Sequence, residues 1–324
     1  MPLPASKTAP VNPEQINAIH AEYREALCGA APGLRERLDH GTMLPISGLM
    51  AVADRYRAVI LDAFGVLYSA GAAVPGATET ITELRRAGLA LRVLTNNASH
   101  SPQQLAQRFA QLGFDLQPEE IITSGGAVYS AAGLAILGDD PYLYLGRPDS
   151  VTHYAPHATE RMVNHPESTL PWSQAATILI CSDSAFYGTD LQPRLEALLS
   201  TRSRPLIVAN PDLVSPSSKG GLKRVAGMTA HLLHQHYGGE LIYLGKPFAP
   251  VFQQCLESLP GIEPQQMLMV GDTIETDILG SIHMGMESCL VHQGIHADRS
   301  LEALETLCRS QGIHPNWVTT TIRS

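Results

Sequence analysis

The chain lacks the sequence features of secreted and membrane proteins. Its five cysteines are scattered and odd in number, and none are spaced as Cys-x-x-Cys, so neither a disulfide framework nor a thiolate zinc site is indicated. No run of residues is apolar and long enough to span a bilayer, and residues Met1 to Lys7 contain no apolar signal segment. These absences predict a reduced, cytoplasmic protein.

The chain also lacks an excess of basic charge. Its net charge of -9 argues against nucleic acid or an anionic membrane as its main partner. A hydrophobic fraction of 44% and a charged fraction of 16% are typical of globular proteins. Because domains typically run about 100 to 200 residues, the 324 residues predict two domains.

Asp62 follows the apolar run Ala58 to Leu61 and passes at once into a turn that contains Gly65. A short Val/Ile/Leu run that ends in a polar residue is typical of a buried parallel strand. In open α/β sheets the reactive groups lie beyond the carboxyl ends of the strands. Asp62 is therefore a candidate nucleophile, and the alternative is an aspartate that only shapes the turn.

Three further apolar runs end in residue types that phosphoryl transfer needs. Because the carboxyl ends of parallel strands meet at one sheet edge, we expect Asp62, Thr95, Lys246 and Asp272 to converge on one pocket. The runs are Leu91 to Leu94 before Thr95-Asn96-Asn97, Leu241 to Gly245 before Lys246, and Gln266 to Gly271 before Asp272 and Asp277.

In this order the four motifs resemble those of the haloacid dehalogenase (HAD) superfamily of aspartyl-nucleophile hydrolases. The resemblance begins at about Tyr56 and continues to the C-terminus, and Gly271-Asp272 followed by Thr276-Asp277 is its most specific part. It implies an α/β fold, with a doubly wound parallel-sheet (Rossmann-like HAD) core and an inserted α/β cap domain. The predicted domains are an N-terminal helical extension (1–50), a core (51–137 and 238–324) and a cap (138–237).

The position of the cap resembles that of the class IIA branch, the p-nitrophenyl phosphatase-like and pyridoxal or phosphoglycolate phosphatase-like enzymes. Only roughly thirty residues separate the first two motifs, which one crossover helix uses up. Asn210-Pro211-Asp212 is similar to a signature of this branch, although it is also a good turn sequence. Within the cap we expect strands at 142–145, 177–181 and 206–209 and helices at 191–199 and 222–236.

The N-terminal extension carries Ile16, Ile19, Tyr23 and Leu27 at helical spacing. This pattern predicts an amphipathic helix that packs either on the core or on a second subunit. The second alternative would make the protein a homodimer.

The resemblance implies a role for each motif. Asp62 would attack phosphorus and become an aspartyl-phosphate, and Lys246 would screen the charge between nucleophile and phosphate. Thr95 and the backbone N–H groups of Asn96 and Asn97 would bind phosphate oxygens. Asn210 and Asp212 would contact the substrate.

The same resemblance implies a Mg²⁺ site. Asp62, Asp272 and the backbone carbonyl of Phe64 would hold the ion, which prefers oxygen ligands. Asp277 would complete the outer shell of the metal and orient Lys246.

Phe64 departs from the family pattern. HAD phosphatases usually carry a second aspartate there, which protonates the leaving group and then deprotonates the hydrolytic water. A phenyl ring can do neither, so turnover of alkyl phosphates should be slow unless another group replaces it. Four residues are candidates for the replacement: Tyr68, His100, Asp183 and Asp212.

Three functions compete. The first is a Mg²⁺-dependent phosphatase acting on a small phosphorylated metabolite. The second is a catalytically impaired protein that binds a phosphorylated ligand or a protein partner, for which Phe64 is the support. The third is a 2-haloacid dehalogenase, because Asp62-Ala63-Phe64-Gly65 resembles the Asp-x-Tyr-Gly of those enzymes. The position of the inserted domain and the retained metal motif oppose the third.

Overall fold

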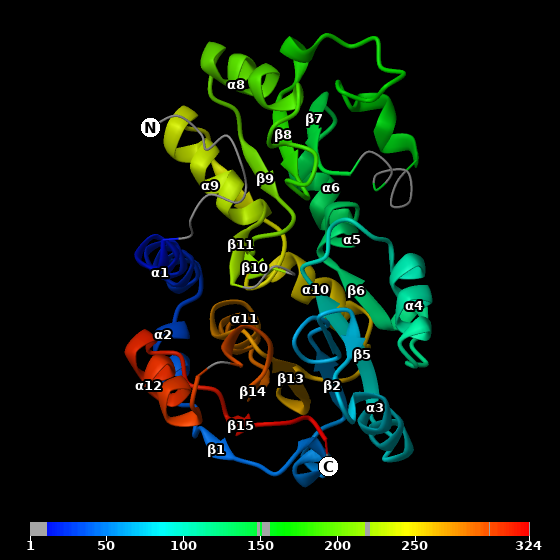
Figure 1. The fold of residues 1–324 in the computed structure, drawn as a ribbon, viewed down its shortest axis with the longest axis vertical. Coiled ribbons are helices and arrows are strands. Elements are labelled where there is room, and N and C mark those ends of the chain that lie inside the picture. Colours follow the sequence, from blue (N-terminus) through cyan, green and yellow to red (C-terminus); the bar gives the residue numbers. More distant parts are fainter. Residues whose placement is uncertain (1–11, 148–149, 151–155, 218–220, 298, 324) are drawn as a thin grey trace. The chain divides into compact units, whose positions relative to one another are not determined.

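The computed structural model describes residues 12–147, 150, 156–217, 221–297 and 299–323 (Figure 1). They divide into two compact units, which we describe separately. The larger unit contains residues 13–95, 103–122 and 246–323, and the smaller unit contains Asn12 and residues 96–102 and 123–245. No helix in the described ranges is both long and apolar enough to cross a membrane.

The larger unit is built on a seven-stranded sheet in the order β1-β15-β14-β13-β2-β5-β6. The neighbouring strands β1-β15-β14-β13-β2-β5 all pair in parallel. All residues of β2 and β13 are buried, which explains why these segments read as continuous apolar runs. The strands are β1 (Leu44–Pro45), β2 (Ala58–Leu61), β5 (Ala90–Thr95), β6 (Ile121–Thr123), β13 (Met267–Gly271), β14 (Glu287–Val291) and β15 (Trp317–Thr319).

Helices cover both faces of this sheet. Val59 and Leu61 pack in one hydrophobic cluster with α3 (Ala77–Arg86) and α4 (Pro102–Gln111). Leu290 packs in another cluster, whose helices are α1 (Pro13–Ala30), α2 (Leu34–Asp39), α11 (Leu279–His283) and α12 (Leu301–Gln311). A short hairpin, β3 (Tyr68–Ser69) with β4 (Ala72–Ala73), follows β2, and α10 (Ala249–Glu257) follows Lys246. The arrangement is doubly wound, as predicted.

The predicted amphipathic helix of the extension is α1. Ile16, Ile19, Tyr23 and Leu27 are all buried. Leu27 packs in the cluster that contains Leu290, and the Tyr23 ring lies against that of Phe248 in the larger unit. The helix therefore packs on the core, which is the first of the two predicted alternatives.

The smaller unit has its own parallel sheet, in the order β12-β9-β8-β7 (Figure 1). One face packs on α8 (Leu191–Thr201) and α9 (Ala226–Tyr237), and the other on α5 (Ser124–Val128) and α6 (Ala131–Leu137). The strands are β7 (Tyr142–Leu145), β8 (Thr177–Ile180), β9 (Leu206–Val208) and β12 (Leu241–Tyr243). A parallel main sheet with a separate small parallel sheet is the fold class that the sequence predicted.

Two predictions about elements were wrong. The helix expected over 222–236 begins only at Ala226, because Leu222–Arg224 form β11, which pairs antiparallel with β10 (Val214–Pro216). The strand before Lys246, β12, belongs to the smaller sheet, so the four motif-bearing runs do not all end at one sheet edge. An apolar run identifies a buried strand, but it does not reveal which strand lies beside it.

Candidate active site

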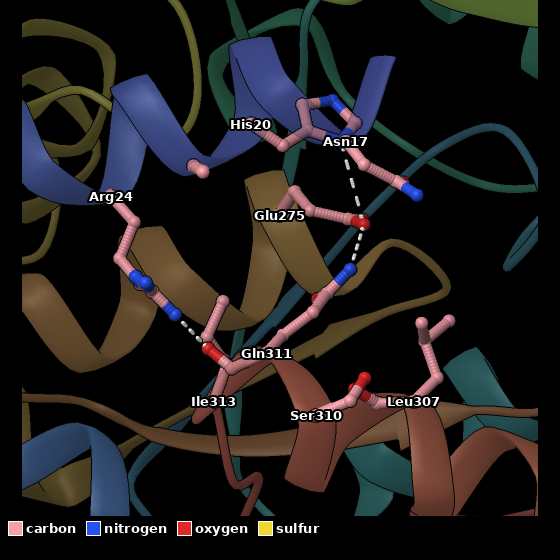
Figure 2. A pocket seen from close by; sticks show the side chains of 9 residues that line it. Asn17, His20, Arg24, Glu275, Leu307, Ser310, Gln311 and Ile313 are labelled. Atoms are coloured by element: carbon pink, nitrogen blue, oxygen red, sulfur yellow. Dashed lines mark hydrogen bonds and ion pairs between the residues drawn. The ribbon is translucent and has the colours of Figure 1, made fainter. Parts of the chain in front are cut away.

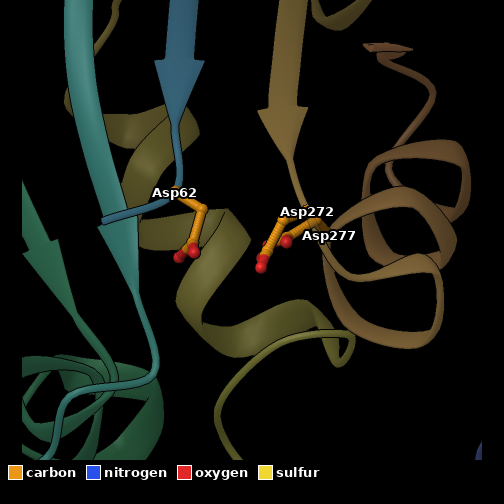
Figure 3. A group of neighbouring side chains, drawn as sticks. All are labelled: Asp62, Asp272 and Asp277. Atoms are coloured by element: carbon orange, nitrogen blue, oxygen red, sulfur yellow. The ribbon is translucent and has the colours of Figure 1, made fainter. Parts of the chain in front are cut away.

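Asp62 and Asp272 follow two neighbouring strands. β2 and β13 pair in parallel with Leu61 opposite Val270, and the backbone N–H of Asp62 donates to the carbonyl of Val270 at 2.8 Å. The two carboxylates therefore leave the sheet at nearly the same level. Figure 3 shows both turned toward one space beyond the strand ends.

Asp277 reaches the same place through an irregular helix. The segment Ile274–Ile278 after β13 is a π-helix, and the Asp277 Oδ2 accepts the backbone N–H of Thr273 at 3.1 Å. A Cβ atom at Gly271 would overlap with the Asp277 side chain, so glycine is required there. One carboxylate oxygen each from Asp62, Asp272 and Asp277 lie within 4.8 Å of one another.

Lys246 joins two of these carboxylates. Its Nζ donates to Asp62 Oδ1 and to Asp277 Oδ1, both at 2.6 Å, and to the backbone carbonyl of Leu94 at 3.1 Å. Its side chain is only 3% exposed. Burial lowers the pKa of the ammonium, but the charges of Asp277 and Asp62 outweigh burial and raise it overall, so Lys246 stays charged.

The site carries an excess of negative charge. Burial, followed by the charges of Asp62 and Asp277, raises the pKa of Asp272 well above its usual range. Burial likewise raises the pKa of Asp277 to about 7, although Lys246 partly offsets the shift. Three carboxylates against one ammonium leave buried oxygen donors that a hard divalent cation would neutralise, so this donor set fits Mg²⁺.

Gly65, Gly294 and Ile295 hold Asp272 in place, and we did not predict Gly294 or Ile295. The backbone N–H of Ile295 donates to Asp272 Oδ2 at 2.9 Å. A Cβ atom at Gly65 or at Gly294 would overlap with the Asp272 carboxylate, and both glycines have positive φ. The signal that could have revealed Gly294 is its place just after the apolar run that forms β14.

Phe64 lies beside Tyr68. Their rings meet edge-to-face with centroids 5.6 Å apart, and the guanidinium of Arg108 lies 5.6 Å from the Tyr68 ring. Burial raises the pKa of Tyr68, Arg108 lowers it, and the charge of Asp62 raises it further. Of the four predicted replacements for the missing acid, Tyr68 is the one that the larger unit contains.

Thr95 ends β5 and is buried in the larger unit, one residue after the carbonyl that Lys246 contacts. The next two residues belong to the smaller unit. The Asn96 side-chain amide donates to Asp212 Oδ1 at 2.7 Å. The Asn97 side-chain oxygen accepts the backbone N–H groups of Ser99 and His100 at 2.9 and 3.0 Å. The predicted phosphate-binding role of these residues therefore depends on their backbone N–H groups.

The Asn210-Pro211-Asp212 segment forms a turn within the smaller unit. Asn210 Oδ1 accepts the backbone N–H of Asp212 at 2.9 Å, and the Asp212 carbonyl accepts that of Gly227 at 3.0 Å. The Asn210 side chain thus stabilises the turn, and the Asp212 carboxylate binds Asn96, so both side chains stabilise the smaller unit. Their contact with a substrate stays a prediction.

His100 and Asp183 also have partners within the smaller unit. His100 Nε2 lies 3.2 Å from an Arg147 guanidinium nitrogen, and Asp183 accepts a hydrogen bond from the Thr229 hydroxyl at 3.3 Å. Both side chains therefore already interact with another side chain of the smaller unit.

Comparison with protein families agrees with this geometry. A family model described as haloacid dehalogenase-like hydrolase matches residues 59–155, and a second, described as HAD-hydrolase-like, matches residues 243–323. The two matches contain Asp62, Lys246, Asp272 and Asp277. The chain belongs to the HAD superfamily.

Individual relatives extend the match through the smaller unit. An acid sugar phosphatase of Staphylococcus aureus is 25% identical over 249 residues, which cover 74% of this chain and 88% of the relative. A solved HAD superfamily structure from Cytophaga hutchinsonii, described as a possible sugar phosphatase, is 27% identical with a TM-score of 0.73 and covers 87% of this chain and 99% of its own. NagD from E. coli K-12 is 25% identical with a TM-score of 0.65, covering 82% and 97%. These similarities confirm the predicted class IIA branch.

Proposed function

We propose that this protein is a Mg²⁺-dependent phosphatase that hydrolyses a small phosphorylated metabolite through an aspartyl-phosphate on Asp62. One observation carries the proposal: a buried lysine is shared at 2.6 Å by Asp62 and Asp277, with Asp272 beside them. Phosphoryl transfer depends on positioning and charge neutralisation, which this arrangement supplies. The names of relatives, which include acid sugar phosphatases, support a sugar phosphate as one substrate class.

In the first step, Asp62 would attack phosphorus and the bond from phosphorus to the ester oxygen would break. Lys246 holds Asp62 Oδ1, which leaves Oδ2 as the attacking oxygen. The Lys246 ammonium would also offset the negative charge of the incoming phosphate. Thr95, at the end of β5, would donate its hydroxyl hydrogen to a phosphate oxygen.

Asp62, Asp272 and the Phe64 carbonyl would hold Mg²⁺, which supplies charge neutralisation for the phosphate oxygens. Both oxygens of Asp277 are engaged, by Lys246 and by the Thr273 N–H, so we propose that Asp277 acts on the ion through water. Asp272 is held at both oxygens, since Oδ2 accepts the N–H of Ile295 and Oδ1 accepts the Thr273 hydroxyl, and its carboxylate would bind the ion through a remaining lone pair.

In the second step, water would attack phosphorus and release phosphate, restoring the Asp62 carboxylate. The leaving alkoxide needs a proton in the first step, and water must lose one in the second. Phe64 can do neither, so we propose that hydrolysis is slow for alkyl esters and that the aspartyl-phosphate is long-lived. We therefore propose slow but measurable hydrolysis. A purely ligand-binding protein would release no phosphate.

The test is release of phosphate from a panel of esters that includes p-nitrophenyl phosphate and several sugar phosphates, with Mg²⁺ or with EDTA. Asp62→Asn serves as the matched control, because it keeps size and shape but removes the nucleophile. We expect Mg²⁺-dependent release by the wild type and at least a 1,000-fold loss in the variant, on the order of the contribution of a covalent nucleophile. If Asp62→Asn retains the wild-type rate, Asp62 is not the nucleophile. If no ester is hydrolysed, the ligand-binding alternative is correct.

A further inference from the structure

A cavity of about 270 Å³ lies in the larger unit, away from the motif residues but next to one of their segments. Helix α1 forms one wall, α12 the opposite wall, and Glu275 of the π-helix projects between them (Figure 2). At about 30 Å³ per water molecule, this space would hold roughly nine waters, enough for a small metabolite but not for a nucleotide. Its lining is Asn17, His20, Ala21, Arg24, Glu275, Leu307, Ser310, Gln311 and Ile313.

Helix α1 turns a polar face to this cavity. Asn17, His20, Ala21 and Arg24 follow the spacing i, i+3, i+4, i+7, so they share one side of the helix. This helix precedes the residues that the family models match, which begin at 59. The cavity is therefore a feature that the N-terminal extension adds to the family core.

Several polar atoms around the cavity are buried without a partner. Glu275 is only 7% exposed, and its Oε1 lies 2.6 Å from Gln311 Nε2 and 3.4 Å from His20 Nδ1. The buried Arg24 Nε and Gln311 Oε1 have no hydrogen-bond partner among the described residues. Since buried polar groups are normally paired, these atoms mark a place where a polar ligand belongs.

The unpaired atoms differ in charge from one part of the cavity to the other. Glu275 presents a carboxylate and Gln311 Oε1 a second acceptor, whereas Arg24 presents its Nε–H. The Nη1 and Nη2 groups of Arg24 donate to the Gln311 carbonyl and to Glu25. Ala21, Leu307 and Ile313 supply an apolar wall. Figure 2 shows Arg24 and Glu275 on separate sides of the cavity.

We propose that this cavity binds a small zwitterion of the amino-acid class. Its ammonium group would lie on Glu275 and Gln311 Oε1, its carboxylate on Arg24, and its aliphatic side chain against Leu307 and Ile313. This arrangement would pair each unpaired atom with a group of opposite character.

Such a ligand would also act on the metal-binding segment, a consequence that rests on the proposed function. Glu275 lies in the same π-helix as Asp277 and three residues after Asp272. A ligand that orders Glu275 changes the freedom of both carboxylates. Because coupling between two sites is reciprocal, Mg²⁺ and the zwitterion change each other's affinity by the same factor.

The test measures binding to the full chain by isothermal titration calorimetry, without Mg²⁺ or phosphate ester. The probes are L-alanine, L-valine and L-leucine, together with 3-methylbutylamine and 4-methylpentanoate, each of which lacks one charge of leucine. We expect at least one amino acid to bind, and the single-charge analogues to bind at least tenfold more weakly. If none of the three amino acids binds, the cavity holds water only and the proposal is wrong. Equal binding of a single-charge analogue would also overturn it.

Two variants locate the site. Arg24→Gln should weaken amino-acid binding at least tenfold, whereas Arg309→Gln, an exposed arginine of α12 outside the cavity, should not change it. Equal melting temperatures of both variants establish that each is folded. Undiminished binding by Arg24→Gln would place the ligand elsewhere.

A final titration with saturating Mg²⁺ tests the coupling. The dissociation constant of the amino acid should change at least threefold, and an unchanged value overturns the coupling. Failure of the phosphatase proposal would appear separately, as absent ester hydrolysis without any amino acid.

Discussion

Under the proposed function, the phenyl ring of Phe64 should decide which esters this site turns over. A leaving group that receives no proton must depart as an anion, so its own stability sets the rate. p-Nitrophenolate, which leaves from p-nitrophenyl phosphate, and acetate, which leaves from acetyl phosphate, are stable anions. A sugar alkoxide is not. Activated esters should therefore react at least 100-fold faster than sugar phosphates, which is the lower end of what general acid catalysis typically contributes, about 100- to 10,000-fold.

Phe64→Asp should reduce this preference. The new carboxyl group would restore an acid and base beside Asp62, so we expect about a tenfold or greater rise in turnover of sugar phosphates and little change for p-nitrophenyl phosphate. Steady-state rates on both ester types measure the effect. Phe64→Leu is the control, because it changes the ring but adds no proton donor.

A role for Tyr68 as the proton donor would contradict this account of Phe64. Burial raises the pKa of its hydroxyl, which therefore keeps its proton at neutral pH, and its ring is in contact with Phe64. Equal wild-type rates for activated and alkyl esters, together with a selective loss of the alkyl rate in Tyr68→Phe, would show that Tyr68 donates the proton. Our account of Phe64 would then be wrong.

At the scale of elements, two turns hold Asp272 in position. The turn after β2 brings Gly65 against its carboxylate, and the segment after β14 brings Gly294 and the N–H of Ile295. Neither glycine can carry a side chain without displacing Asp272. The proposed metal site thus depends on backbone approach from two loops as well as on the carboxylates themselves.

Gly294→Ala tests this dependence, with Gly285→Ala as the matched control. Both glycines have positive φ, so each alanine should destabilise by about 1 kcal/mol. A Cβ atom at Gly294 would overlap with the Asp272 carboxylate, but at Gly285 the nearest atom would be 3.9 Å away. We therefore expect Gly294→Ala alone to raise the Mg²⁺ concentration needed for half-maximal activity, by roughly tenfold or more. An equal Mg²⁺ requirement in both variants would refute the role of the close approach.

The sequence predicted some elements well and others not. β7 was predicted at its observed bounds, and β2 and β13 were identified from their apolar runs, because burial on both faces leaves a local pattern. The partner of β12 and the π-helix at Ile274–Ile278 were not predicted. Strand pairing depends on residues far apart in the chain, and the apolar pattern does not reveal the close packing of Asp277 against Gly271. The same limit explains why Ile295, which acts only through its backbone, was missed.

For the whole molecule, we expect the buried carboxylates to make folding stability depend on both pH and Mg²⁺. An aspartate ionises near 3.9 in the unfolded chain, whereas burial raises the pKa of Asp277 to about 7 and also raises that of Asp272. The folded state then binds more protons than the unfolded state between these values. Stability from this cluster is present below about pH 4 and is lost as the pH rises toward 7.

Mg²⁺ should reverse that loss, because it binds the ionised carboxylates of the folded state and competes with protons. A ligand at 100 times its dissociation constant stabilises by about 2.7 kcal/mol. We expect the difference in melting temperature between Mg²⁺ and EDTA to be small at pH 5 and to grow to several degrees at pH 8, measured by differential scanning calorimetry. Asp272→Asn should abolish most of the gain at both pH values, which separates this cluster from other titrating groups. An equal gain at pH 5 and pH 8 would mean that the carboxylates are already ionised in the acidic range, contrary to the charge balance found around Lys246.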